Sequence, residues 1–516
     1  MTASTSADAA AQDRVFAFLT DPATHPGVQR IDTHAAAVFL EGTRALKIKR
    51  AIRFPYLDYS TLAKRKAACD EELRVNRPFA PQIYHRVVAI TQNPDGSLSI
   101  GGSGTPVEFA VEMTRFDERQ TIDRLAEAGE PDRELVDAIA DAIAASHAVA
   151  QPAPAERWIE SISAFIDDNT AALRTAACFP ASDVDDLDGA SRSALCRIRK
   201  LLEQRGRQGY VRRCHGDLHL ANIALIDRRP VLFDAIEFDA SIASVDVFYD
   251  LAFPIMDFLR YGRGAAANAL LNRYLVSTAS ETLDALSALP LFMSLRSAIR
   301  AKVLLARMGV NSRDKAGVLR SASAYFELAR EAIHPPAPTL VAIGGLSGTG
   351  KSMLARALAP SVLPQPGAVV LRSDVLRKQL FKINETDRLP ERAYRPEITA
   401  QIYQIMVQRA RRALSQGHSV VVDAVFAEQA DRNAISQTAR QLKVRFNGFF
   451  LRADLATRQS RVVRRKRDAS DATPEIAGLQ EQYDIGAVDW DIIDASGTPE
   501  QTLERCQARI THREAA

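Results

Sequence analysis

The stretch from Gly345 to Ser352, GLSGTGKS, limits the fold of the second half of this chain more than any other feature. It fits the pattern GxxxxGK[ST], and it lies between the short apolar run Leu340–Ile343 and a helical stretch. In that context the glycines let backbone amides turn inward around phosphate oxygens, and the helix N-terminus adds a favourable dipole. The pattern therefore predicts a strand, a phosphate-binding loop and a helix in immediate succession.

The residues of this loop divide into a phosphate cradle, a cation and a metal ligand. We expect Lys351 to reach the terminal phosphates as a catalytic cation, and the Ser352 hydroxyl to bind Mg²⁺. A glycine-rich turn of purely structural use is the alternative, which the position between a strand and a helix disfavours. ATP and Mg²⁺ are therefore the expected cofactors, and the expected nucleotide-binding residues here are Gly345, Ser347, Gly348, Thr349, Gly350, Lys351 and Ser352.

Beyond residue 338 the chain alternates short apolar runs with longer amphipathic stretches. Strands that alternate with helices in this way predict a parallel sheet covered by helices on both faces. The predicted fold of this half is therefore an α/β P-loop NTPase domain. Its expected strands are 339–343, 368–372, 419–422, 444–451 and 490–494, and its expected helices include 398–416, 427–443, 455–467 and 499–509.

Two aspartates follow strands of this sheet, at the edge where open parallel sheets bind their ligands. Asp423 follows HSVVV and is the expected partner of Ser352 in binding Mg²⁺. Asp374 follows AVVLRS and is the expected catalytic carboxylate for a substrate hydroxyl, while Arg377 and Lys378 suit neighbouring anionic groups. Capping of the next helix is the alternative role for Asp374.

The basic stretch TRQSRVVRRKRDASDA follows the fourth expected strand. A solvated helix face and a nucleic-acid patch are two interpretations of such a charge run. The net charge of the whole chain is only +3, which does not indicate a dedicated nucleic-acid binder. We therefore expect a lid in which Arg461, Arg464 and Arg465 offset charge on the nucleotide and on the transferring phosphoryl group.

The motifs GGLSGTGKS, LRSDVLRK and VVVDAVF resemble those of the small P-loop kinases that phosphorylate metabolites, nucleotides or polynucleotide ends. Gluconate kinase and the kinase half of polynucleotide kinase belong to that group. The resemblance extends from Thr339 to the C-terminus. It implies transfer of a phosphoryl group without identifying the substrate.

The stretch RRCHGDLHLANIAL gathers polar side chains just before an apolar run. A kinase catalytic loop needs an aspartate to accept the substrate hydroxyl proton and, five positions later, an asparagine to bind Mg²⁺. Asp217 and Asn222 have that spacing, and Asp234 in RRPVLFDAIEFD supplies a second metal-binding aspartate after a short hairpin. The alternatives are a zinc site on His215, Asp217 and His219, and a purely structural polar cluster.

The segments HGDLHLAN, VLFDAIEFD and DVFYDLAF resemble the aminoglycoside phosphotransferase and choline kinase group, whose loop typically reads HGDxHxxN. The resemblance implies an α+β protein-kinase-like domain in which Asp217 is the catalytic base and Asn222 and Asp234 bind Mg²⁺. It also implies that Asp250 braces the loop. Ala221 departs from the glycine that many members carry before the asparagine, and this departure removes no chemical group.

The segment before this loop should supply a lysine for the ATP phosphates and a glutamate that holds the lysine. The pattern Ala-x-Lys in RALKIKR gives Lys47 that role, with Ala45 facing the adenine on the same side, and Lys49 is the second choice. Glu72 is the expected partner on the following helix, and Glu71 is the second choice.

The segment His334–Pro338 marks a boundary, because its prolines lack the amide donor that a helix needs. A chain of 516 residues is also too long for one core. We predict an aminoglycoside phosphotransferase-like domain over 1–334, with a small lobe over about 1–113 and a helical lobe over about 114–334. A P-loop domain is predicted over 335–516, and each domain should fold by itself.

The five cysteines include no CxxC pair, and the N-terminal stretch lacks the pattern of a signal peptide. No run of about 18 apolar residues that could span a membrane is present either. We therefore expect a cytoplasmic protein that does not contact a membrane.

Together these features predict a bifunctional kinase with two separate nucleotide sites, which transfers the γ-phosphoryl group of ATP to a hydroxyl of a small molecule. Two alternatives stay open. The P-loop half could be an ATPase switch that regulates the N-terminal kinase, or the chain could phosphorylate the 5′-hydroxyl end of a polynucleotide, although a nucleic-acid partner is not expected. The sequence leaves the acceptor and the oligomeric state undefined.

Overall fold

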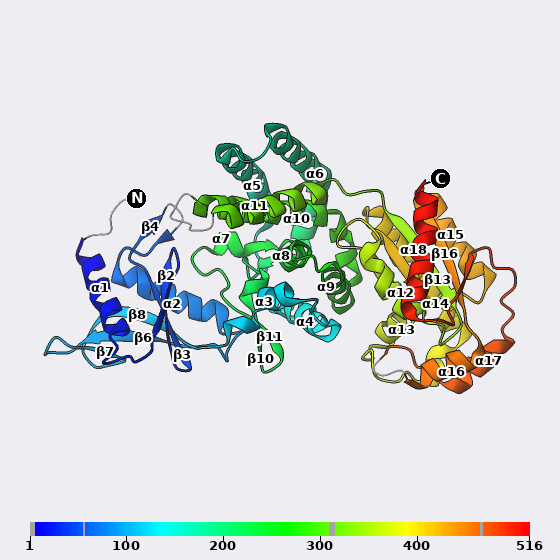
Figure 1. The fold of residues 1–516 in the computed structure, drawn as a ribbon, viewed down its shortest axis with the longest axis horizontal. Helices are drawn as coiled ribbons and strands as arrows, with labels where there is room; N and C mark the ends of the chain where they lie inside the picture. The colour runs from blue at the N-terminus through cyan, green and yellow to red at the C-terminus, as the bar shows by residue number, and fades with distance from the viewer. Residues whose placement is uncertain (1–5, 55–56, 309–314, 465–467, 516) are drawn as a thin grey trace. The chain divides into compact units, whose positions relative to one another are not determined.

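A computed structural model describes residues 6–54, 57–308, 315–464 and 468–515, and their contacts form two compact units (Figure 1). The first unit comprises Met1–Ala164 and Leu202–Asp257, and the second comprises Phe165–Leu201 and Phe258–Ala516. These divisions do not coincide with the predicted boundary between residues 334 and 335, which stays a prediction. No helix among the described residues is long and apolar enough to cross a membrane.

The first unit contains a six-stranded antiparallel sheet with the order β1-β2-β3-β8-β6-β7. Strands β2 and β3 form an antiparallel hairpin, and Gly42 at its turn has φ +54°, which favours glycine. Helices α1 and α2 pack against the sheet. The bounds are α1 Ser6–Thr20, β1 Gln29–Asp32, β2 Ala36–Glu41, β3 Arg44–Lys49, α2 Leu62–Asn76, β6 Tyr84–Gln92, β7 Leu98–Ile100 and β8 Thr105–Thr114.

The alternation of side chains along β3 places its two lysines. Leu46 and Ile48 are buried in a core cluster with Val15 of α1. Because successive side chains of a strand point to opposite faces, Lys47 and Lys49 face the other side of the sheet. Helix α2 packs on that side. The strand therefore directs both lysines toward the helix that carries Glu72.

The remaining elements that begin in the first unit are mostly helical, as predicted. The hairpin β10–β11 follows the loop of Asp217, and Asp227 and Arg228 at its turn have φ of +49° and +61°. The bounds are β4 Arg53–Phe54, β5 Leu57–Asp58, η1 Glu118–Gln120, α3 Ile122–Ala128, α4 Arg133–Val149, α5 Ala155–Ala176, β9 Val211–Arg213, η2 Leu220–Asn222, β10 Ile223–Ile226, β11 Arg229–Leu232, α7 Ala240–Ala243, β12 Ser244–Asp246 and α8 Val247–Arg260.

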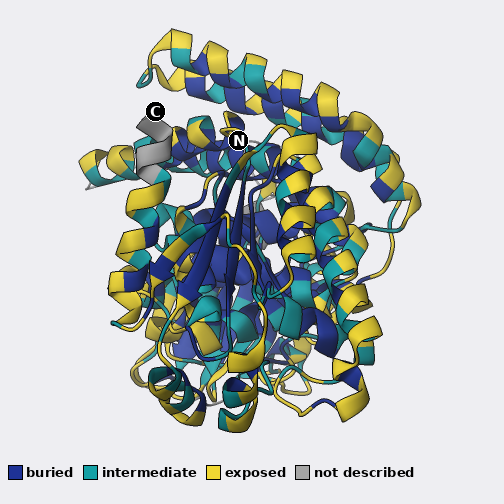
Figure 2. Ribbon diagram, turned by 90° about the vertical axis from the view of Figure 1, so that its right-hand side faces the viewer, coloured by how far each residue is buried: buried dark blue, intermediate teal, exposed yellow. Residues whose placement is uncertain are grey.

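The second unit is built on a five-stranded parallel sheet with the order β14-β15-β13-β16-β17, so the predicted parallel sheet is confirmed. Its central strands are buried, and the flanking helices expose only their outer faces (Figure 2). The strands are β13 Thr339–Gly345, β14 Val369–Arg372, β15 Val420–Asp423, β16 Arg445–Arg452 and β17 Asp491–Asp494.

The helices around this sheet follow the predicted alternation. The predicted helix over 455–467 is described as far as Arg464, and its last three residues lie outside the described residues. The bounds are α12 Lys351–Leu358, η4 Ala359–Ser361, α13 Ser373–Phe381, η5 Glu391–Tyr394, α14 Pro396–Ser415, α15 Gln429–Leu442, α16 Leu455–Arg464, α17 Pro474–Leu479, η6 Gln480–Gln482 and α18 Pro499–Ala515.

Helix α9 covers the edge of this sheet at β14. The remaining elements of the unit are α6 Ala181–Arg207, which begins in it, and α9 Gly264–Ser277, η3 Ser280–Ser287, α10 Leu289–Met308 and α11 Lys315–Ile333. Asn272 Oδ1 accepts a hydrogen bond from the Val370 backbone N–H at 2.6 Å. The side-chain amides of Asn268 and Asn272 donate to the Ala368 carbonyl at 3.0 and 3.1 Å. Two asparagines of α9 thus satisfy backbone groups that an edge strand would otherwise expose.

We expect Asn272→Ala to lower the free energy of unfolding of the second unit by about 1–3 kcal/mol, because the Val370 N–H loses its buried acceptor. Urea unfolding followed by the fluorescence of Trp490, in a Trp158→Phe background, measures this change. Asn433→Ala, on an exposed position of α15, is the matched control. Equal effects of the two substitutions would contradict the role of α9 at the sheet edge.

Candidate active sites

The first candidate site is built around Lys47 on β3. Lys47 Nζ lies 2.8 Å from Oε1 of Glu72, which is fully buried on α2, and it also pairs with the carboxylate of Asp234. Burial alone would lower the pKa of Lys47, but the carboxylates of Asp234 and Glu72 outweigh it and raise the pKa well above its ordinary value. Lys47 is therefore a permanent cation that links the sheet, the helix and the segment after β11.

Lys49 holds the other oxygen of the same glutamate. Its Nζ lies 2.6 Å from Glu72 Oε2 and pairs with Glu237. Tyr59 also donates its hydroxyl to Glu237 at 3.2 Å. Glu72 is thus bound by both lysines. Sequence analysis missed Glu237, although its position three residues after Asp234 was a usable signal.

The loop between β9 and β10 carries Asp217 and Asn222. The Asp217 side chain is 43% exposed, and His219 Nε2 lies 3.5 Å from its Oδ2. Asn222 donates its Nδ2 to the Asp217 carbonyl at 2.9 Å, so its side-chain oxygen is the remaining polar atom of that amide. The Asn222 side chain therefore bonds to the backbone of Asp217, five residues earlier, and the Asp217 carboxylate stays accessible.

Buried polar groups hold this loop in place. Gly216 has φ +82° and donates its N–H to Oδ1 of the fully buried Asp250 at 2.9 Å. The His215 ring shares a hydrogen bond of 2.8 Å with the Phe233 carbonyl. Burial lowers the pKa of His215, so the ring is neutral near pH 7 and the N–H that it donates is fixed by that carbonyl. Asp250 thus braces the loop as the sequence predicts.

Asp234 adopts a left-handed backbone conformation at the end of β11. Its φ is +62°, and its N–H donates to the Tyr84 hydroxyl at 3.1 Å. Burial would raise the pKa of the Asp234 carboxyl, but the Lys47 ammonium outweighs this effect and lowers the pKa to about 2. The carboxylate of Asp234 and the amide oxygen of Asn222 are hard oxygen donors, which fit Mg²⁺.

The zinc alternative has no support from the described residues. The His, Cys, Asp and Glu side chains that converge closely enough there are His147, Cys214 and Asp250. Two of them are already engaged, because the His147 ring lies 3.2 Å from the Asp250 carboxylate, which also accepts the Gly216 N–H. These three side chains therefore belong to the contacts that hold the loop of Asp217, and they include neither His215 nor His219.

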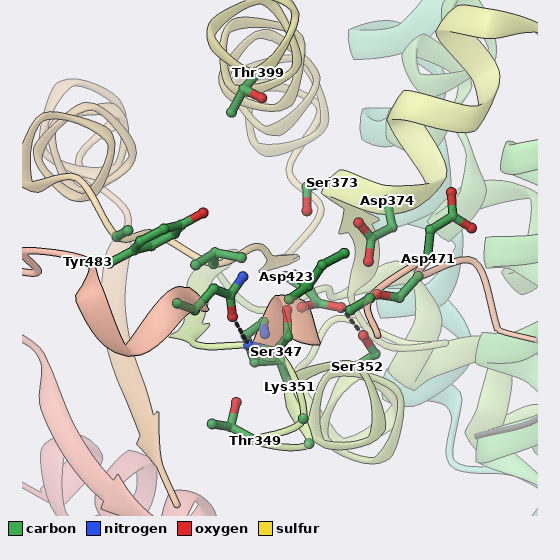
Figure 3. A pocket seen from close by; sticks show the side chains of 18 of the residues that line it. Ser347, Thr349, Lys351, Ser352, Ser373, Asp374, Thr399, Asp423, Asp471 and Tyr483 are labelled. Atoms are coloured by element: carbon green, nitrogen blue, oxygen red, sulfur yellow. Dashed lines mark hydrogen bonds between the residues drawn. The ribbon is translucent and has the colours of Figure 1, made fainter. Parts of the chain in front are cut away.

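The second candidate site lies at the phosphate-binding loop after β13. Ser352 donates its Oγ to Oδ2 of Asp423 at 2.6 Å, and Arg372 Nε lies 3.3 Å from the same oxygen (Figure 3). Lys351 donates its Nζ to the Leu346 carbonyl at 3.0 Å. Ser352 and Asp423 therefore present paired oxygens that fit Mg²⁺, beside a lysine that folds over its own loop.

A cavity of about 1450 Å³ opens in front of this loop. It exceeds the usual 300–1,000 Å³ of a single-ligand pocket, so a nucleotide and an acceptor have room together. The residues outside the loop that line the cavity include a set here named the distal wall, which comprises Asp374, Arg377, Tyr394, Thr399, Tyr403, Glu428, Asp431, Tyr483 and Asp484. Figure 3 shows several of these side chains around the cavity.

Asp374 lies in the first turn of α13 and lines this cavity. Burial raises the pKa of its carboxyl, the Arg372 guanidinium opposes this effect, and the net pKa lies above its ordinary value. Arg377, one turn later, is 6% exposed and donates to the Ala393 carbonyl and to Thr399 Oγ1. Lys378 is instead engaged by Asp471 at 2.8 Å. Of the two residues expected to bind anionic groups, Arg377 lines the cavity and Lys378 does not.

The expected lid arginines also differ in their surroundings. Arg461 donates to the carbonyls of Ala495 and Gly497, both at 2.7 Å, and lines the cavity beside Arg464. Arg465 lies outside the described residues. Arg461 thus joins α16 to the segment after β17, a link that sequence analysis did not indicate.

Comparison with protein families separates the two halves of the chain. Residues 42–287 match the model of the phosphotransferase enzyme family, and residues 340–483 match that of the AAA domain. The first match contains Asp217, Asn222 and Asp234, and the second contains the phosphate-binding loop. The predicted pairing of the two domain types and the predicted fold class are thereby confirmed.

Relatives along the whole chain occur in mycobacteria. Uncharacterized proteins of Mycobacterium tuberculosis and Mycobacterium bovis are each 29% identical over 507 residues, which is 93% of this chain and 94% of theirs. Among solved structures, a choline/ethanolamine kinase family protein from Mesorhizobium loti is 15% identical, with a TM-score of 0.37, over 63% of this chain and 99% of its own. A gluconokinase from Sinorhizobium meliloti is 18% identical, with a TM-score of 0.25, over 34% and 93%.

Proposed function

We propose that this ATP-dependent kinase, whose chain joins a phosphotransferase-family domain to a P-loop kinase-like domain, has two separate nucleotide sites that each transfer the γ-phosphoryl group to a hydroxyl of a small molecule. One observation carries the proposal. In each half a lysine and a pair of oxygen donors occur together with a further carboxylate, Asp217 or Asp374, that can take a proton. This is the set of groups that phosphoryl transfer to an alcohol requires.

In the first site, Lys47 binds the ATP phosphates and Glu72 holds the lysine in place. We choose Lys47 over Lys49 because it pairs with both Glu72 and Asp234, whereas Lys49 is directed to Glu237. Asn222 and Asp234 would hold Mg²⁺, whose charge would offset that of the phosphates. Asp217 accepts the hydroxyl proton of the acceptor as the new P–O bond forms and the bond to ADP breaks.

In the second site, the loop amides bind the phosphates, and Lys351 stabilises the charge on the leaving and transferring groups. Ser352 and Asp423 hold Mg²⁺. Asp374 accepts the acceptor proton, and its raised pKa makes it a stronger base than an ordinary surface aspartate.

The distal wall indicates which acceptors suit the second site. Its described residues include four carboxylates, from Asp374, Glu428, Asp431 and Asp484, and one cation, Arg377. The rest of the cavity outside the loop also presents Asp423, Asp468, Asp471, Arg356, Arg461 and Arg464. Burial and, to a smaller extent, the neighbouring Glu428 raise the pKa of Asp431. An acidic wall favours a neutral polyol or an amine-bearing alcohol, and it repels the phosphates of a polynucleotide end.

We expect the second site to release ADP in response to polyols, amino alcohols or amino sugars. The full chain carrying Asp217→Asn, in which the first site is silenced, should be incubated with ATP and Mg²⁺ and with panels of these acceptors, of sugar acids and of 5′-hydroxyl oligonucleotides. Stimulation of at least about tenfold by a neutral or amine-bearing acceptor, and none by oligonucleotides, is expected, since like charges repel.

The other outcomes decide between the alternatives. Phosphorylation of the oligonucleotides with a steep salt dependence would establish a polynucleotide kinase. ADP release that no acceptor stimulates, with Asp374→Asn leaving it unchanged, would favour a regulatory ATPase switch.

A further inference from the structure

A side chain from the segment α17–η6 accepts a hydrogen bond from one of the backbone amides of the phosphate-binding loop. Gln480 Oε1 accepts a hydrogen bond from the Ser347 backbone N–H at 2.7 Å, and the dashed line at Ser347 in Figure 3 marks this contact. Gln480 is only 6% exposed. Because the backbone N–H can only donate, the atom that meets it is the side-chain oxygen.

The segment that carries Gln480 is attached firmly to the same loop. Gly348 has φ +86°, and a Cβ added there would lie 2.4 Å from the Arg458 carbonyl oxygen, so α16 packs directly on the loop. Arg458 is 1% exposed, and it donates to the Ala477 carbonyl at 2.8 Å and to the carboxylate of Glu481. These contacts of α16 and α17 place Gln480 next to the loop.

The loop amide cannot serve Gln480 and a phosphate at once. A phosphate oxygen is charged, and hydrogen bonds to charged acceptors are roughly twice as strong as those to neutral ones. A phosphate that enters the loop would therefore displace the Gln480 oxygen from Ser347. The displacement costs part of the binding free energy of the phosphate, because a buried hydrogen bond is broken first.

We propose that Gln480 is a built-in competitor for phosphate at the second site, so that its side-chain oxygen occupies the Ser347 amide until a phosphate displaces it. The inference rests on the proposed function of this loop and goes beyond it, because it assigns a regulatory contact to a residue outside the nucleotide-binding pattern. Tyr483 and Asp484 lie three and four residues after Gln480 and belong to the distal wall. Displacement of Gln480 thus also acts on the wall where the acceptor would bind.

The test measures ATP affinity in the full chain carrying Lys47→Ala, which weakens the first site equally in every variant. Gln480→Ala should tighten ATP binding by about two- to tenfold, since a competing hydrogen bond is removed. Gln480→Glu should weaken it by about tenfold or more, because a charged acceptor holds the amide more strongly and repels phosphate. The affinity for adenosine, which carries no phosphate, should not change in either variant. Titration calorimetry with ATP and with adenosine provides these values.

The controls separate this inference from the proposed function. Gln437→Ala, at an exposed position of α15, should leave ATP affinity unchanged. Lys351→Ala should strongly weaken ATP binding at the second site in this background, and if it does not, the proposed nucleotide site itself is wrong. If Lys351→Ala behaves as expected but Gln480→Ala leaves ATP affinity unchanged, weakens it, or shifts ATP and adenosine alike, the competitor role is overturned. Gln480→Glu retains an acceptor for Ser347, so it keeps the test decisive even if the alanine variant does not fold.

Discussion

Replacing Asp217 with asparagine should reduce phosphoryl transfer at the first site by about a hundredfold to ten-thousandfold, with ATP affinity nearly unchanged. The carboxylate is accessible, and the loop around it is held by Asn222, His215 and Asp250 rather than by the Asp217 side chain. An amide of the same shape keeps that geometry but cannot accept the acceptor proton. A loss confined to kcat would identify an interaction made in the transition state.

The measurement needs the second site to be silent. In a Lys351→Ala background, acceptor-dependent ADP release should report the first site alone. Asp227→Asn is the matched control, because Asp227 lies at the turn of the β10–β11 hairpin with φ +49°, a conformation that asparagine adopts readily. Unchanged turnover in Asp217→Asn, or an equal loss in the control, would exclude Asp217 as the catalytic base.

The local parts of the fold were predictable because they depend on neighbouring residues. The alternation of apolar runs with amphipathic stretches predicted the parallel sheet, and the five expected strands were placed within one or two residues of β13 to β17. Strand periodicity likewise placed Lys47 on the face that meets Glu72. Each of these predictions rests on patterns less than about 30 residues long.

The remaining features depend on contacts between distant segments. Lys47 and Lys49 share one face of β3, so periodicity could not choose between them, and the choice rests on Asp234, 187 residues away. Gln480 meets Ser347 across 133 residues, and no spacing rule connects the two positions. Asn272 reaches the sheet edge across 98 residues. Such long-range contacts depend on how the elements pack together, and no periodic pattern in a single sequence indicates them.

Replacing Lys351 with alanine should reduce transfer at the second site by at least about a hundredfold and should also weaken ATP binding. The ammonium group folds over its own loop, within 3.0 Å of the Leu346 carbonyl, beside the amides that bind phosphate. A cation fixed there stabilises charge on the leaving and transferring groups, and alanine cannot replace it. Asp374→Asn should differ by lowering transfer about a hundredfold while ATP affinity is largely kept, because the carboxylate acts on the acceptor.

The contrast between these two variants is the decisive observation for the second site. Both are compared by acceptor-dependent ADP release in the Asp217→Asn background and by ATP titration in the Lys47→Ala background, with Lys315→Ala at an exposed position of α11 as the matched control. Loss of ATP binding in Lys351→Ala alone, together with loss of transfer in both variants, requires two separate roles in one reaction. If Asp374→Asn weakens ATP binding as much as Lys351→Ala does, Asp374 belongs to the nucleotide site, and another group must take the proton of the acceptor.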